Sequence, residues 1–165
     1  MSTRNRVGGI VYAASLVLSL LLGLVALPAS LLPLKPFWPA LVVVYWALEA
    51  PEKMSIGRAF VLGLAGDLLT GSLLGEQALR LAIVAFIVLR LRARMRFFPM
   101  LQQCLAIFAL LVNDRVVMLM IRAFSGGGMA EWQYWIAPAV GTLAWPWLFL
   151  ALDVARQRGA RAREA

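Results

Sequence analysis

Long apolar stretches, separated by short polar or glycine- and proline-containing segments, run along most of this chain. A helix needs about 20 mostly apolar residues to cross the hydrocarbon core of a bilayer, so a chain of 165 residues has room for about six spans. The pattern predicts an all-α, polytopic membrane helix bundle in which residues 1–154 form a single integral-membrane domain. The predicted spans are Val7–Leu27, Phe37–Ala50, Ala59–Leu74, Gln77–Leu89, Phe97–Ala123 and Trp132–Leu152.

The segments between these spans differ in charge. Arg90–Arg96 is predicted to be a basic loop, Ser125–Glu131 a flexible connector, and residues 155–165 a disordered basic tail. Lysine and arginine concentrate in the N-terminus, in alternate connections and in the tail. Because short cytoplasmic segments are enriched in these residues, we expect both termini to be cytoplasmic. The arginines of the basic loop also favour contact with anionic membrane lipids.

A carboxylate, Asp67, lies near the centre of the third predicted span. An ionised aspartate at the bilayer centre costs about 2.5–3.5 kcal/mol on insertion scales, so this side chain is expected to face protein rather than lipid. Gly63, Thr70 and Gly71 lie one helical turn away, and Gly75 follows them. Small residues let another helix approach closely. We therefore expect a tight helix–helix contact around Asp67.

Other ionisable residues also interrupt apolar spans. Arg80, in the fourth span, lies at a depth that matches Asp67, so the two side chains are predicted to pair. The alternative is that Arg80 reaches the outer interface and that Asp67 is neutralised or binds a hydroxyl group. Asp114 and Arg115 interrupt the fifth span near its outer end. They are interpreted either as an interfacial cluster or as a docking patch for an extracytoplasmic partner.

Two further pairs are candidates for partner docking. Gln102 and Gln103 enter the fifth span at its cytoplasmic end, where they either form hydrogen bonds between helices or lie at the interface. Tyr45 and Trp46 lie in the second span. Their simplest role is packing or anchoring rather than caging a ligand.

Composition excludes several classes of site. Histidine is absent and Cys104 is the only cysteine, which removes intramolecular disulfides, histidine-based metal sites and Ser-His or Cys-His nucleophiles. The net charge of +8 is distributed like a topology signal rather than like a nucleic-acid recognition helix. The glycine-rich stretches lack the contexts that bind phosphates in nucleotide sites. We expect no enzyme activity, no cofactor and no nucleic-acid partner.

Several short segments together form a recognisable pattern. They are Trp38-Pro39, Tyr45-Trp46-Ala47-Leu48, the stretch from Gly63 to Leu79, Phe98-Pro99 with Gln102-Gln103, and Trp145-Pro146 before the basic tail. In this combination the chain resembles the MreD family of bacterial rod-shape-determining membrane proteins, and the resemblance covers nearly the whole chain.

The resemblance implies a non-enzymatic component of the inner-membrane machinery that inserts peptidoglycan into the side wall. It implies partnership with the bitopic protein MreC, with the actin-like MreB filament, and with the RodA glycosyltransferase and its transpeptidase. It also implies a fold similar to the six-helix substrate-binding components of vitamin transporters.

Three functions follow from these observations. The first is a scaffold and regulator of wall synthesis that binds an MreC-like protein. The second is a transporter-like small-molecule binder, in which Asp67, Arg80, Asp114 and Tyr45 converge on a cavity open to the outside. The third is a lipid-handling protein whose arginines hold a pyrophosphate; it ranks last because nearly all arginines lie in predicted cytoplasmic segments.

Overall fold

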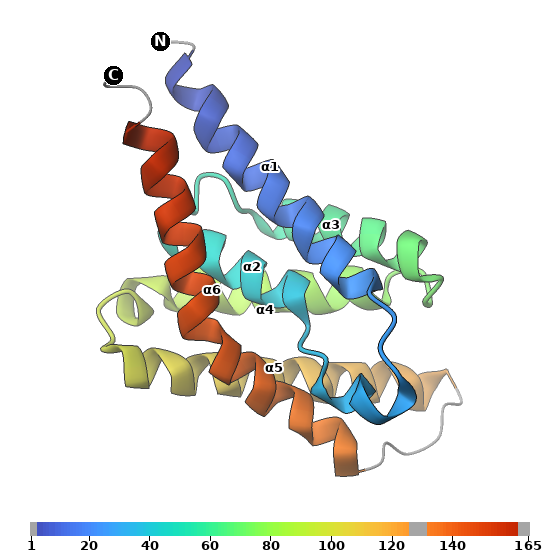
Figure 1. Cartoon of the computed structure of the whole chain (residues 1–165). Helices are drawn as coiled ribbons and strands as arrows, with labels where there is room; N and C mark the ends of the chain where they lie inside the picture. The colour runs from blue at the N-terminus through green and yellow to red at the C-terminus, as the bar shows by residue number, and fades with distance from the viewer. Residues whose placement is uncertain (1–2, 126–131, 162–165) are drawn as a thin grey trace.

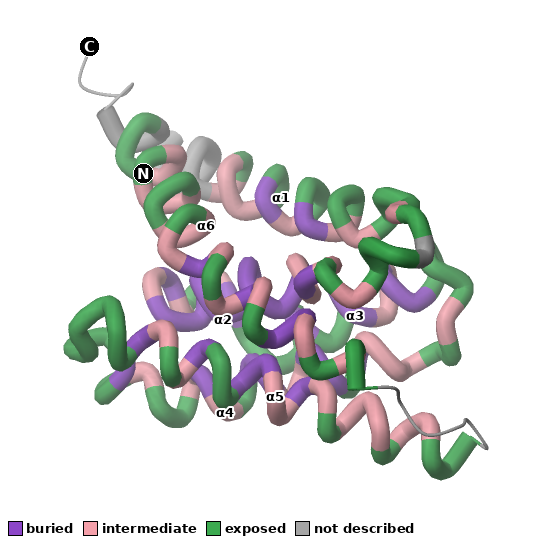
Figure 2. The backbone as a smooth tube through the Cα atoms, turned by 60° about the horizontal axis from the view of Figure 1, so that its bottom comes forward, coloured by how far each residue is buried: buried purple, intermediate pink, exposed green. Residues whose placement is uncertain are grey.

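The helix that is apolar on every side lies at the centre of the molecule. The computed structural model describes residues 3–125 and 132–161, and within it α2 (Trp38–Glu49) is buried from Pro39 to Leu48 without interruption. A helix that is apolar all round lies either in a protein core or in lipid, and the burial of α2 places it in the protein core. It is contacted by α1, α3, α4 and α6. Figure 2 shows the purple, buried backbone of α2 between α1 on one side and α4 and α5 on the other.

The described residues form five further α-helices besides α2, which confirms the predicted all-α fold with six helices. Two short 3-10 helices, η1 and η2, precede α2 and α6 (Figure 1). The bounds are α1 Thr3–Leu24, η1 Ala29–Leu34, α3 Ile56–Thr70, α4 Glu76–Met95, α5 Met100–Phe124, η2 Trp132–Trp135 and α6 Ile136–Arg161.

Two segments that were predicted to be irregular are helical, so these predictions were wrong. The basic loop Arg90–Arg96 is mostly the last part of α4, and the predicted tail from residue 155 continues α6 as far as Arg161. Arginine, alanine and glutamine are good helix formers, so a basic sequence of this kind propagates a helix that has already begun. Residues 126–131 of the predicted connector and residues 162–165 of the tail lie outside the described part of the chain.

Among the described residues, three segments are long and apolar enough to cross a membrane by length and composition: Ser30–Glu49, Met100–Phe124 and Trp132–Arg158. Apolar side chains also cover the outside of the bundle. On α5, Leu101, Leu105 and Phe108 form an exposed stripe. Extended apolar surface of this kind is rare on soluble monomers and fits a membrane protein. In contrast, α3 has 15 residues and is only about 22 Å long, shorter than a bilayer core of about 30 Å.

The start of α1 and the end of α6 lie toward the same end of the molecule (Figure 1). The connections from α2 to α3 and from α4 to α5 lie toward that end as well. An ion pair supports this arrangement, because Arg156 near the end of α6 binds Glu49 at the end of α2 with 3.1 Å between Nη2 and Oε2. We call this the terminal end of the bundle. The opposite end holds η1, the turn between α3 and α4, and the end of α5.

The tight contact predicted around Asp67 is confirmed at Gly63. A Cβ atom added to Gly63 would lie 2.4 Å from the Cα atom of Ala78 on α4. Only a residue without a side chain allows the two backbones to come this close. Gly71 has a different role: it ends α3 with a φ of +65°, and an added Cβ would meet nothing within 4 Å.

Replacing Gly63 by alanine is expected to lower the free energy of unfolding by about 1–3 kcal/mol, because α3 and α4 would have to separate. The matched control is Gly57→Ala on the same helix, where an added Cβ meets nothing within 4 Å. The control should be neutral or stabilising by up to about 1 kcal/mol. Unfolding by SDS titration in mild detergent, followed by circular dichroism, measures both. Equal stability of the two variants would contradict the close contact.

Candidate functional site

Asp67 lies three residues before the end of α3, where it caps the neighbouring helix. Its Oδ1 accepts hydrogen bonds from the Ser72 hydroxyl at 2.8 Å and from the Gln77 backbone N–H at 2.9 Å. Its Oδ2 accepts from the Gly75 N–H at 2.8 Å and from the Ala78 N–H at 3.4 Å. The Gly75 N–H lies just before α4 and those of Gln77 and Ala78 in its first turn, where backbone N–H groups have no partner within the helix.

The position of this carboxylate explains how a buried acid is stabilised. The residue before α4 is Gly75, which has no side chain that could cap the helix, so Asp67 supplies the cap from α3. A negative charge at the N-terminus of a helix also interacts favourably with the helix dipole. Asp67 is 1% exposed, as expected for an acid that faces protein. It lies near the end of a short helix, however, and not at the centre of a long span.

Side chains around the same turn join α3 and α4 further. Thr70 donates a hydrogen bond to the Gly66 carbonyl oxygen at 2.8 Å and accepts one from the Gln77 amide at 2.8 Å. The Gln77 amide also lies 3.4 Å from the Ser72 hydroxyl. With Asp67, these residues form a polar network that holds the α3–α4 turn in one conformation. Ser72 and Gln77 were not singled out in the sequence, although they flank Gly75 closely.

The predicted Asp67–Arg80 pair is wrong, because Arg80 binds Asp114 on α5 instead. Arg80 Nε lies 2.8 Å from Asp114 Oδ1 and Nη2 lies 2.5 Å from Oδ2, which is the two-pronged geometry that arginine forms with carboxylates. Both side chains are nearly inaccessible. The Arg80 guanidinium also lies 4.2 Å above the centre of the Phe37 ring and 3.7 Å from Glu76. Asp67 was expected either to pair with Arg80 or to be neutralised or bind a hydroxyl group. In the structure it accepts a hydrogen bond from the Ser72 hydroxyl.

The Arg80–Asp114 pair locks α4 to α5 near the end of the bundle opposite the termini. Asp114 therefore is not part of an exposed interfacial cluster. Glu76, four residues before Arg80 on α4, was missed in the sequence even though this spacing is typical of helical ion pairs.

The other residues predicted to dock a partner separate into buried and accessible ones. Tyr45 and Trp46 are fully buried in α2, where the Trp46 indole N–H donates to Ser15 at 2.8 Å. Gln103 is buried as well and accepts a hydrogen bond from the Trp145 indole at 3.3 Å. These three residues hold helices together, which does not fit a docking role. Gln102 is exposed at the start of α5.

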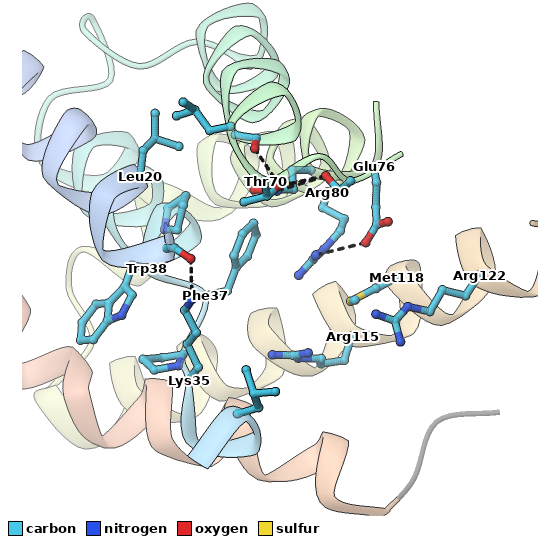
Figure 3. Close-up of a pocket in the computed structure, with 18 residues that line it drawn as sticks. Leu20, Lys35, Phe37, Trp38, Thr70, Glu76, Arg80, Arg115, Met118 and Arg122 are labelled. Atoms are coloured by element: carbon cyan, nitrogen blue, oxygen red, sulfur yellow. Dashed lines mark hydrogen bonds and ion pairs between the residues drawn. The ribbon is translucent and has the colours of Figure 1, made fainter. Parts of the chain in front are cut away.

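Arg115 lines a cavity of about 350 Å³ at the end of the bundle opposite the termini. Figure 3 shows the guanidinium groups of Arg80 and Arg115 directed into the space between the helices, with Arg122 further along α5. Polar residues from the Asp67 network form another part of the wall. The lining includes Lys35, Phe37, Trp38, Thr70, Ser72, Glu76, Gln77, Arg80, Arg115, Met118 and Arg122. We call this space the basic cavity.

The basic cavity differs from the one expected for a transporter-like binder. Of Asp67, Arg80, Asp114 and Tyr45, only Arg80 lines it. Asp67 binds backbone N–H groups at the start of α4, and Asp114 binds Arg80. Tyr45 lies in the core beside Phe149. The predicted convergence of these four residues is therefore wrong. Arg115 and Arg122 share one face of α5 near its outer end, as their spacing predicts, but the cavity that they line with Arg80 was not predicted.

Comparison with known proteins gives a consistent result along most of the chain. The family model of the rod shape-determining protein MreD matches residues 4–154. The rod shape-determining protein MreD of Haemophilus influenzae is 32% identical over 142 residues, which cover 86% of this chain and 88% of that relative. No solved structure gives a significant match. The expected likeness to vitamin-transporter components thus has no support from solved structures.

Proposed function

Because the chain belongs to the MreD family of rod shape-determining proteins, we propose that it is a non-enzymatic scaffold of the cell-elongation complex in the bacterial inner membrane. In this role it supports lateral peptidoglycan synthesis and rod shape by binding an MreC-like bitopic protein. A RodA-like glycosyltransferase and its transpeptidase work in the same complex. The basic terminal end faces the cytoplasm, where an MreB-like filament lies against the membrane.

The observation that carries this proposal is an apolar groove between α1, α2 and α6. It has a volume of about 390 Å³, and small residues lie between larger apolar walls. Ser15 and Ser19 contribute from α1, and Ala144 and Ala151 from α6. In lipid, helices associate mainly through close packing at small residues, since there is little hydrophobic gain from leaving the bilayer. The groove therefore suits the single membrane helix of an MreC-like partner.

Internal hydrogen bonds make the floor of this groove suitable for an apolar partner. The Ser15 hydroxyl donates to the Tyr12 carbonyl oxygen at 2.8 Å, and the Ser19 hydroxyl donates to the Leu16 carbonyl oxygen at 2.7 Å. Their polar groups are satisfied within α1, so a partner helix can cover them without providing hydrogen bonds. The Asp67 network and the Arg80–Asp114 pair support a scaffold in another way, because they hold α3, α4 and α5 in fixed relative positions.

Filling the groove is expected to release the partner. Ala151→Trp places a large side chain in the groove, and overpacking of this kind should weaken the free energy of partner binding by about 1–3 kcal/mol. The amount of co-purified MreC-like protein should then fall about fivefold or more. Cells that depend on this variant should become round. Co-purification from mild detergent, followed by mass spectrometry and microscopy of the cells, measures both effects.

The matched control is Ala139→Trp, an exposed alanine of the same helix that does not line the groove. This variant should retain the partner and the rod shape. Thermal unfolding of both purified variants separates loss of binding from loss of fold. Normal co-purification and rod-shaped cells with a stably folded Ala151→Trp protein would contradict the groove as the partner site.

A further inference from the structure

The basic cavity contains positive charge that no carboxylate of residues 3–125 and 132–161 neutralises. Arg80 is neutralised by Asp114 and Glu76. Lys35 donates to the carbonyl oxygens of Gly23 and Val25, and a cation at the end of α1 interacts favourably with the free carbonyl groups there. Across residues 3–125 and 132–161, no carboxylate forms an ion pair with Arg115 or Arg122.

These two arginines are held side by side. They lie seven residues apart on α5, which is about two helical turns, so they share one face. Both guanidinium groups lie over the ring of Tyr134 in η2, at 4.5 Å for Arg115 and 5.6 Å for Arg122. The Tyr134 hydroxyl is buried and has no hydrogen-bond partner within the described part of the chain. The aromatic ring holds the arginines in place. Their N–H donors bind no side chain in the described part of the chain, so a ligand can accept from them.

The remaining walls indicate what kind of ligand fits. Gln77 and Thr70 contribute polar groups to the wall, whereas Phe37, Trp38 and Met118 contribute apolar surface. One part of the lining therefore suits an anion and the other suits hydrocarbon. Arginine forms two parallel hydrogen bonds with phosphate oxygens, and a phosphate has enough oxygens to bind two arginines at once. A volume of about 350 Å³ leaves room for the group that carries the phosphate.

We propose that the basic cavity binds a phosphate group through Arg115 and Arg122. The phosphate belongs either to the headgroup of a membrane lipid or to a soluble phosphate. The site lies at the opposite end of the bundle from the basic segments of α4 and α6, so it is distinct from any general attraction of those segments to anionic lipid. The proposal does not depend on the partner groove.

Binding is tested on the full chain purified in mild detergent, by native mass spectrometry and by the ligand-induced shift in unfolding temperature. The ligands are phosphatidylglycerol, inorganic phosphate, and diacylglycerol as a lipid without phosphate. We expect phosphatidylglycerol or inorganic phosphate to bind and diacylglycerol not to. Binding of phosphatidylglycerol alone identifies a lipid headgroup as the source, and equal binding of inorganic phosphate identifies a soluble one.

The decisive variant is Arg115→Gln/Arg122→Gln, for which affinity should fall about tenfold or more, since losing even one charge-assisted hydrogen bond has an effect of about this size. Its matched control is Arg90→Gln/Arg92→Gln, which removes the same charge at the terminal end and should leave this affinity unchanged. Met118→Trp keeps both arginines but fills the cavity, so it should weaken binding even if the double variant does not fold.

Three results would overturn the proposal. The first is that no phosphate compound binds to the unaltered protein. The second is that binding is the same in Met118→Trp and in the folded arginine variant as in the unaltered protein. The third is that an acidic peptide stabilises the protein through these arginines whereas phosphate compounds do not, which would make the cavity a protein-docking site.

Discussion

Replacing Asp114 by alanine is expected to lower the free energy of unfolding by about 3–5 kcal/mol, because it leaves the Arg80 guanidinium buried without its partner. The carboxylate provides both short contacts of the pair, and Arg80 is only 5% exposed. Glu76 lies further away, at 3.7 Å, and replaces at most part of this interaction. SDS titration in mild detergent measures the loss.

A double variant distinguishes an unpaired charge from a simple loss of packing. Replacing a buried ion pair by apolar residues is often close to neutral, so Arg80→Met/Asp114→Leu should be more stable than Asp114→Ala alone. The matched control is Asp153→Ala, which removes a partially exposed ion-pair partner of Arg156. This variant should lower the free energy of unfolding by about 0–1 kcal/mol. A loss below about 1 kcal/mol in Asp114→Ala, or strictly additive effects of the two positions, would contradict a coupled pair.

Replacing Asp67 by leucine is expected to lower the free energy of unfolding by about 3 kcal/mol or more, because several partly buried donors lose their acceptor at about 1–3 kcal/mol each. The donors are the Ser72 hydroxyl and the backbone N–H groups of Gly75 and Gln77. The effect should be concentrated at the start of α4. Hydrogen exchange of the amides at residues 75–78 should therefore accelerate more than exchange in α2 or α5.

Asp67→Asn is the matched variant for this experiment. The amide keeps one carbonyl oxygen that can accept from the α4 N–H groups but loses the negative charge at the helix N-terminus. Its loss of stability should be smaller than that of Asp67→Leu, within the range of about 0.5–2 kcal/mol measured for helix caps. If leucine, asparagine and aspartate give the same exchange rates at residues 75–78, Asp67 does not cap α4.

Both predictions concern residues that the sequence identified without identifying their partners. A carboxylate and an arginine within apolar stretches were recognisable as buried groups, since each is too costly to leave in lipid. Helix rise then matched Asp67 with Arg80 in depth. Equal depth in the membrane does not show that two side chains face each other. Because α3 ends at Thr70, Asp67 lies beside the first turn of α4. Arg80 lies one turn later on α4 and faces Asp114 on α5.

The ends of the helices also differ from what the hydrophobic pattern alone predicts. The left-handed conformation of Gly71 ends α3 earlier than the apolar run suggests, because leucines continue after the helix has stopped. At the end of α4 the opposite occurs: arginines that suggest a loop continue the helix to Met95. Hydrophobicity predicts where a segment is buried in lipid, whereas backbone conformation and helix propensity decide where the helix ends.

The sequence by itself determined the all-helical architecture, the number of helices, the burial of Asp67 and the close approach at Gly63. These properties follow from composition and from the types of residues within single segments, which set the free energy of placing each segment in lipid or against protein. Only the tertiary structure decided that Arg80 binds Asp114, 34 residues away, and that Arg115 and Arg122 meet at Tyr134. Such contacts depend on how each helix is rotated about its axis and displaced along its neighbours, and no periodicity within one helix specifies either quantity.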